Sequence, residues 1–191
     1  DKHGNLIKDE MIEAPFPSFA HDFFVTKKYV VFPVYPLVFN LERAINGGIP
    51  MAWEPQRGAH FGVMPRTGTA ADVTWHSMDP RWSFHMVNAW DEGDAIKVDI
   101  CASNATRFAP KLDGSMASAE EGLTPMLRRW TIDVGGTTNT VAEEMLDDMP
   151  CEFPRTDDRF MTRTHRHAWL VGGHDAQLMF NRLLHYDMET E

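Results

Sequence analysis

The sequence predicts an all-β protein, and three observations lead to that prediction. Apolar and polar residues alternate over short segments such as 83–90 and 95–102, and a period of two is typical of β-strands. Turn-forming clusters such as Asp91–Asp94 separate these segments at close spacing. Helical patterns are scarce. Many short antiparallel strands with regular turns favour a sandwich, a barrel or a propeller.

The individual elements follow from the same patterns. In chain order we expect strands at Leu6–Glu13, Ala20–Thr26, Tyr29–Val34, Ala59–Pro65, Val73–Ser77, Ser83–Trp90, Ala95–Ala102, Met126–Val134, Thr140–Leu146, His167–Val171 and Gln177–Asp187. Pro36–Gly48 is expected to form one short helix that ends at its glycine pair, and Ser118–Thr124 about one further helical turn.

The expected hairpin at Ser83–Ala102 contains a histidine that packing alone does not explain. Strict alternation places His85, Val87 and Ala89 on one face of the first strand. A histidine on such a face is either a hydrogen-bonded core residue or a ligand. The alternation leaves both interpretations open.

Composition excludes several classes of protein. The formal charge of −10 argues against a surface that binds nucleic acid. The longest apolar run, Tyr29–Phe39, contains two prolines and is shorter than the roughly 18 residues of a membrane span. Only Cys101 and Cys151 carry thiols, so no disulfide framework is expected and a reducing cytoplasm is favoured.

Both ends of the sequence have the pattern of the middle of a β-meander. Open sheet edges at both ends of a complete domain would promote aggregation. We therefore expect residues 1–191 to be the central fragment of a single, larger all-β domain.

The nine histidines suggest a metal site, and each is weighed first as a structural residue. His165 and His167 are two apart and would share a strand face as a chelating pair, but neighbouring arginines would repel a cation, which favours a structural role. His21 and His85 differ because each lies among apolar residues. Neutral imidazole suits iron, zinc, copper and nickel, and composition does not choose among them. The remaining histidines receive no role: His3, His60, His76, His174 and His185.

Three stretches occur in an order that resembles a known family. They are "AHDFFVTKKYVVFPVYPL" (20–37), "FHMVNAWDEGD" (84–94) and "CEFPRTDDRF" (151–160), and "HFGVMPR" (60–66) and "NRLLHYDMET" (181–190) also fit. With them the chain resembles the carotenoid cleavage oxygenases, seven-bladed β-propeller enzymes with non-haem iron. The resemblance implies about three blades of such a propeller and is closest to bacterial lignostilbene dioxygenases.

The resemblance also implies roles for particular residues. His21 and His85 match iron ligands, and Glu152 matches the carboxylate that accepts a hydrogen bond from a ligand histidine, here His85. The cofactor implied is ferrous iron, Fe(2+), held by four histidines. One missing ligand position lies upstream of His21 and the other beyond Glu191, so the fragment alone is expected to be inactive. Three aromatic side chains are candidates to line a substrate tunnel, although each is also an ordinary core residue: Phe61, Phe84 and Phe108.

The implied activity is a dioxygenase that adds O₂ across the C=C bond of a lignostilbene-type stilbene and gives two aldehydes. Its partners would be O₂ and a small apolar or aromatic alkene. Apocarotenoid cleavage is the near alternative, and a non-catalytic β-propeller binding module is the alternative of another class. An isomerase of the same fold ranks lower, since Tyr35–Ile45, the one apolar stretch comparable to a membrane-attachment patch, carries Glu42 and Arg43. The sequence leaves open whether the protein forms a homodimer.

Overall fold

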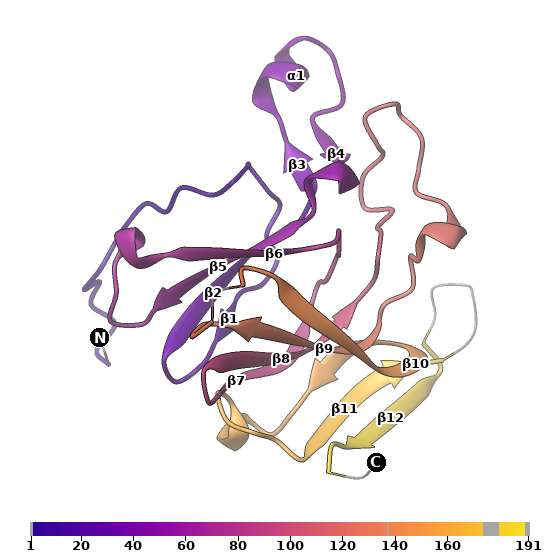
Figure 1. The fold of residues 1–191 in the computed structure, drawn as a ribbon. Helices are drawn as coiled ribbons and strands as arrows, with labels where there is room; N and C mark the ends of the chain where they lie inside the picture. Colours follow the sequence, from indigo (N-terminus) through magenta and orange to yellow (C-terminus); the bar gives the residue numbers. More distant parts are fainter. Residues whose placement is uncertain (1, 137, 174–179, 190–191) are drawn as a thin grey trace.

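Antiparallel β-strands are the main regular structure of the chain, which confirms the predicted all-β class (Figure 1). The computed structural model describes residues 2–136, 138–173 and 180–189. Its strands are β1 (Phe24–Val25), β2 (Tyr29–Val34), β3 (Leu37–Phe39), β4 (Met51–Trp53), β5 (Ala59–Pro65), β6 (Thr74–Met78), β7 (Met86–Glu92), β8 (Ala95–Ala102), β9 (Met126–Asp133), β10 (Val141–Arg155), β11 (His167–Gly172) and β12 (Arg182–Asp187). The helical elements are α1 (Leu41–Ile45) and the 3-10 turns η1 (Pro55–Arg57), η2 (Ala70–Asp72), η3 (Ala119–Glu121) and η4 (Asp158–Phe160).

The strands form three sheets. One has the order β1-β2-β5-β6, the second β12-β11-β10-β9-β8-β7, and the third is the β3-β4 pair. Strand β10 belongs to two halves of the second sheet, because its first part pairs with β9 and its last part with β11. A register shift between Met145 and Pro150 interrupts the pairing with β9, and the pairing with β11 begins at Cys151. The long strand therefore leads the chain from one group of strands into the next.

Large aromatic side chains join the first two sheets into one core. Phe24 and Phe61 of the first sheet pack against Trp130 of β9, with 5.2 Å between the ring centroids of Phe61 and Trp130. All three are fully buried, and burial of one such side chain contributes about 1.5–3 kcal/mol. Strands β1 and β7 also lie against each other. The residues that precede these two strands are thereby brought together.

The strand predicted at Leu6–Glu13 was wrong. This segment is irregular, and Met11 is 92% exposed. No strand in residues 2–136, 138–173 or 180–189 pairs with it. Alternation alone does not make a strand, because its backbone groups also need a hydrogen-bonding partner.

The helix predicted over Pro36–Gly48 is shorter than expected. Its first residues form β3, in which Leu37 pairs with Trp53 of β4, and only Leu41–Ile45 is helical. The Asn40 side chain caps this helix by accepting a hydrogen bond from the backbone of Arg43 at 2.8 Å. Burial of Leu37 and Val38 in the sheet competes successfully with the helical pattern.

The alternation predicted for the 83–102 hairpin fails at a β-bulge. Met86 pairs with Ile100 while Asn88 pairs with Asp99, so β7 carries one extra residue. As a result Val87 and Ala89 pack in different hydrophobic clusters rather than on one shared face. His85 lies immediately before this bulge, where the strand changes direction.

Other boundaries also differ from the predictions. The strand expected at Ala20–Thr26 is only β1, and the one expected at Thr140–Leu146 continues as β10 to Arg155. Strand β12 begins at Arg182, while 177–179 of the predicted Gln177–Asp187 strand lie outside the described residues. No helix within the described ranges is long and apolar enough to cross a membrane.

Candidate metal centre

His21 and His85 lie next to each other although they are far apart in sequence. His21 precedes β1 and His85 precedes β7, the two strands that pack together. Their imidazole centroids are 5.2 Å apart and their planes are nearly perpendicular, at 86°. His21 is exposed, and the His85 side chain is 33% exposed. Two ligand-type side chains therefore meet at an accessible position.

Glu152 holds His85 in a defined orientation. Its Oε2 atom lies 2.7 Å from Nδ1 of His85 and also accepts the backbone N–H of Phe153 at 2.6 Å. The Glu152 side chain is only 9% exposed. A carboxylate at Nδ1 favours the tautomer that carries its proton there. The lone pair of Nε2 is then available for a metal ion.

This donor set fits a histidine-ligated metal. Neutral imidazole backed by a carboxylate is a common arrangement at iron and zinc sites. Among the described residues, however, no group of three or more His, Cys, Asp or Glu side chains could hold a metal ion. The two imidazoles thus match half of the four-histidine set that the family resemblance implies.

An aromatic cluster adjoins the two histidines. The Phe84 ring lies edge-on to His21, with centroids 5.3 Å apart, and contacts both Trp82 and Phe108. Phe19 completes the cluster through ring contacts with Trp82 and Phe108. Phe108 is 50% exposed. Such a surface suits a planar, apolar ligand.

Phe61 does not join this cluster. It is fully buried in β5 and its ring contacts are with Phe24, Tyr35 and Trp130. The structure therefore brings two of the three aromatic candidates, Phe84 and Phe108, to the neighbourhood of the histidines. Phe61 fills the core between the sheets.

Sequence reasoning missed Phe153, which lies beside His85 with ring centroids 5.3 Å apart. Its backbone has a positive φ of 51°, which is uncommon for a residue with a bulky side chain. This conformation accompanies the short hydrogen bond from its N–H to Glu152. The sequence signal was its position directly after Glu152, but alternation would have assigned it to the opposite face.

Within residues 2–136, 138–173 and 180–189, the other histidines join no group of three or more metal-ligand side chains. His165 is buried against Trp90 and lies 3.5 Å from Asp99, and burial lowers its pKa. His167 instead contacts His185 across β11 and β12, with 3.1 Å between ring nitrogens. These contacts agree with the structural role favoured for His165 and His167, because the two side chains lie in different surroundings.

Comparison with known proteins gives consistent matches over most of the chain. A family model described as RPE65, retinal pigment epithelial membrane protein, matches residues 1–191. Isoeugenol monooxygenase of Pseudomonas putida is 32% identical over 170 residues, which are 89% of this chain and 36% of that protein. Lignostilbene-alpha,beta-dioxygenase isozyme III of Sphingomonas paucimobilis is 31% identical over 209 residues, covering 100% of this chain and 42% of that protein.

Solved structures agree with these matches. The crystal structure of Pseudomonas brassicacearum lignostilbene dioxygenase superposes with a TM-score of 0.87 at 34% identity, over 96% of this chain and 41% of that one. Cobalt-substituted Synechocystis ACO has a TM-score of 0.73 at 23% identity, over 90% of this chain and 36% of that one, and supports the fold alone. The predicted fold class, part of an all-β propeller, is confirmed. The chain spans about two fifths of the length of these relatives.

Proposed function

The chain belongs to the RPE65 and carotenoid cleavage oxygenase family, and on that premise we propose that its full-length protein is a non-haem Fe(II) dioxygenase. The proposed reaction is cleavage of a C=C bond in a lignostilbene-type stilbene to two aldehydes. The observation that carries this proposal is the contact of His21 with His85, together with the hydrogen bond from His85 to Glu152.

The family implies a metal cofactor, and iron is our proposal for its identity. His21 and His85 would hold it, with Glu152 fixing the proton of His85 on Nδ1. When bound there, a ferrous ion would supply the redox chemistry that activates O₂. Residues 1–191 are proposed to be the central part of the propeller, so the remaining ligands come from elsewhere in the full-length chain.

The protein's own contribution is to position the alkene and exclude water. The rings of Phe84 and Phe108 offer an apolar wall next to His21, on which an aromatic ring of the substrate can stack. In the overall reaction the C=C bond breaks and each alkene carbon gains one atom of O₂. The two products are therefore aldehydes, and no further reductant is required.

The substrate class follows from the relatives and the aromatic cluster together. Relatives at 31–34% identity are named for lignostilbene and isoeugenol, both phenolic aryl alkenes. The exposed ring of Phe108 and its stacked neighbour Trp82 suit such a planar substrate. Apocarotenoid cleavage is the alternative, supported by relatives named carotenoid cleavage oxygenase at 33% identity over 65% of this chain.

The proposal is tested with the full-length protein loaded anaerobically with Fe(II). A hydroxylated stilbene, isoeugenol and an apocarotenoid are supplied separately with ¹⁸O₂, and O₂ uptake and products are measured. We expect two aldehydes in equal amounts from the stilbene, each carrying one labelled oxygen, and little turnover of the apocarotenoid. Preferred apocarotenoid cleavage would contradict the substrate. A protein that remains metal-free and inactive after Fe(II) addition would instead support a non-catalytic binding module.

A further inference from the structure

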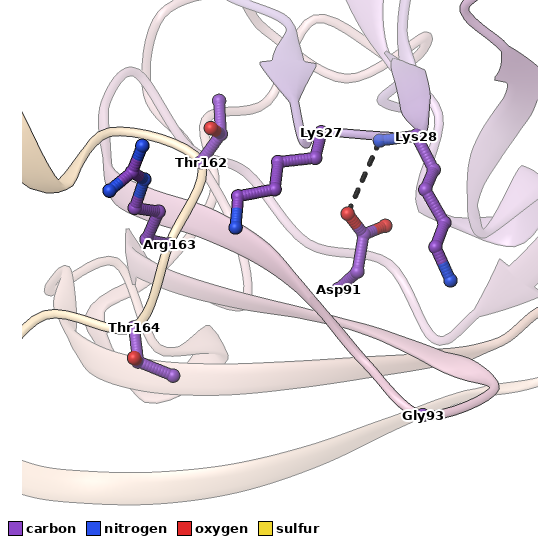
Figure 2. A pocket seen from close by; sticks show the side chains of 7 residues that line it. All are labelled: Lys27, Lys28, Asp91, Gly93, Thr162, Arg163 and Thr164. Carbon is purple, nitrogen blue, oxygen red and sulfur yellow. Dashed lines mark hydrogen bonds between the residues drawn. The ribbon is translucent and has the colours of Figure 1, made fainter.

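We propose that the pocket at the opposite end of β1 and β7 binds a small oxyanion, such as a phosphate or carboxylate group. This pocket, here called the cationic pocket, has a volume of about 490 Å³, within the range of small-molecule sites. Its lining residues come from three segments: Lys27, Lys28, Asp91, Gly93, Thr162, Arg163 and Thr164 (Figure 2). The inference does not rest on the proposed dioxygenase activity.

The three segments are ends and loops that the fold brings to one place. Lys27 and Lys28 form the turn between β1 and β2, and Gly93 lies in the turn between β7 and β8. Thr162 to Thr164 follow η4, beyond the end of β10. His21 and His85 precede β1 and β7, whereas these turns follow them. The cationic pocket therefore lies away from the candidate metal centre.

The charge in the pocket is positive on a chain that is strongly acidic. Lys27, Lys28 and Arg163 contribute three cations against the single carboxylate of Asp91, while the chain as a whole carries −10. Within the described part of the chain none of the three cations has an ion-pair partner. Lys27 and Arg163 lie on the same side of Asp91 (Figure 2), so their like charges repel each other unless an anion lies between them.

Asp91 is already engaged by neighbouring groups. Its Oδ1 accepts the hydroxyl proton of Thr26 at 2.8 Å, and its Oδ2 accepts the backbone N–H of Lys28 at 3.2 Å. Figure 2 shows Lys27 and Arg163 on one side of Asp91, with the Lys28 side chain on the other. The carboxylate thus fixes the β1–β2 turn, and the Lys27 and Arg163 side chains remain available to a ligand.

The loop that carries Arg163 is held in place by a buried side chain. Asn88 donates from Nδ2 to the carbonyls of Phe160 and Arg163 at 3.0 and 2.8 Å, and accepts the N–H of Thr162 at 3.1 Å. Thr162 has a φ of 66°, a conformation that a β-branched residue rarely adopts. A loop fixed in this way presents its side chains with little further loss of entropy on binding.

The side chains define the chemistry of the ligand. An arginine guanidinium can donate two parallel hydrogen bonds to a phosphate or carboxylate, and lysine adds a point charge. The hydroxyls of Thr162 and Thr164 are further donors at the rim. A phosphate or carboxylate group matches this set, and a neutral or cationic ligand does not.

Binding is measured by isothermal titration of inorganic phosphate, and separately of succinate, into the full-length protein at low salt. The double variant Lys27→Met with Arg163→Met removes two pocket cations and keeps their apolar stems. The matched control, Lys2→Met with Arg159→Met, removes one lysine and one arginine charge outside the pocket. We expect the pocket variant to bind at least about tenfold more weakly and the control to bind as the unmodified protein does. The stronger of the two ligands identifies the preferred anion.

A third variant is expected to strengthen phosphate binding instead of weakening it. Asp91→Asn removes the one carboxylate of the pocket and keeps one of the two acceptor oxygens that hold the β1–β2 turn. It should tighten phosphate binding about threefold or more. Equal weakening by the pocket and control variants would overturn the proposal, because net charge alone would then explain binding. Absence of binding in the full-length protein would also overturn it, as would an acidic side chain from elsewhere in that chain occupying the pocket.

Discussion

The two ends of β1 and β7 carry opposite chemistry. Before these strands stand His21 and His85, next to an aromatic cluster and one buried carboxylate. After them come Lys27, Lys28 and Asp91, next to Arg163. Strands rise about 3.3 Å per residue, so the length of β7 separates its two ends by roughly 20 Å. The same pair of strands therefore carries two proposed sites, one for a metal ion and one for an anion.

A later segment, β10 and the loop that follows it, contributes residues at both ends of β1 and β7. Strand β10 supplies Glu152 to His85, and the loop after it supplies Arg163 to the cationic pocket. Asn88, in the middle of β7, connects that loop to the strand. The two sites are thus chemically separate but depend on one scaffold.

The largest effect is expected at the histidine end. His21→Ala or His85→Ala in the full-length protein removes a proposed iron ligand, and stilbene cleavage should fall more than about 100-fold, beyond the usual effect of losing a supporting residue. Initial rates at saturating substrate measure this change. His60→Ala, which removes an imidazole that hydrogen-bonds the backbone of Arg57 and contacts the ring of Phe16, is the control and should keep its rate. Normal activity in both ligand variants would rule out the site.

A smaller effect is expected from Glu152→Gln, which keeps the shape of the side chain but removes its charge. The affinity for Fe(II) should fall about 10–100-fold, because His85 loses the carboxylate that orients it. Anaerobic metal titration measures this affinity, and circular dichroism checks the fold. Glu144→Gln, an exposed change on the same strand, should leave the affinity unaltered. An unchanged affinity in Glu152→Gln would show that the carboxylate does not support the ligand.

Asn88→Ala tests whether phosphate binding at one end of β7 can be weakened without an equal loss of Fe(II) binding at the other end. Loss of this buried amide removes the donor to the carbonyl of Arg163 and one of the two donors to the carbonyl of Phe160, and should cost about 1–3 kcal/mol of stability. Phosphate binding should weaken about threefold or more, because Arg163 is no longer held, while Fe(II) binding changes less. Equal loss at both sites, with the fold intact, would show that β7 couples them.

The smallest effect on ligand binding is expected from replacing Glu143, a residue of β10. Burial raises the pKa of this carboxyl, but hydrogen bonds from Arg81 and Trp130 and the charge of Arg128 outweigh it, so the pKa is lowered. Its contribution to stability is therefore full above the ordinary carboxyl pKa of about 4.3 and is lost as the pH falls through the lowered value.

Denaturant unfolding between pH 3 and 7 would reveal this dependence. Glu143→Gln should lower stability by about 1–3 kcal/mol at pH 7 and flatten the acid part of the profile. Both sites should keep their ligand affinities at pH 7. If the variant lost stability on acidification as the unmodified protein does, a group other than Glu143 would cause the pH dependence.

The sequence predicted the fold class from the alternation of residues, and it predicted the contact of His85 with Glu152 from the family motifs. Alternation located most strands, yet it could not reveal the bulge at Met86–Asn88, which depends on pairing with β8. Nothing in the spacing of His85 and Glu152 makes them neighbours, and only the ordered family motifs suggested their contact.

The cationic pocket was not predicted, because its parts are distant in sequence. In the sequence, Lys27 and Arg163 are ordinary charged residues far from each other. They line one pocket because the fold places the β1–β2 turn next to the loop after η4. No local pattern encodes that approach. The same reason explains the failure at Leu6–Glu13, where the pattern was present but no strand in the described part of the chain pairs with it.

The iron content of the full-length protein tests the central claim most directly. After anaerobic loading with Fe(II) and removal of free metal, we expect about one iron per chain in the unmodified protein and in Lys27→Met with Arg163→Met. His21→Ala with His85→Ala should retain almost none. Stoichiometric iron in the double histidine variant, with the fold intact, would contradict the assignment of the metal to this end of the strands.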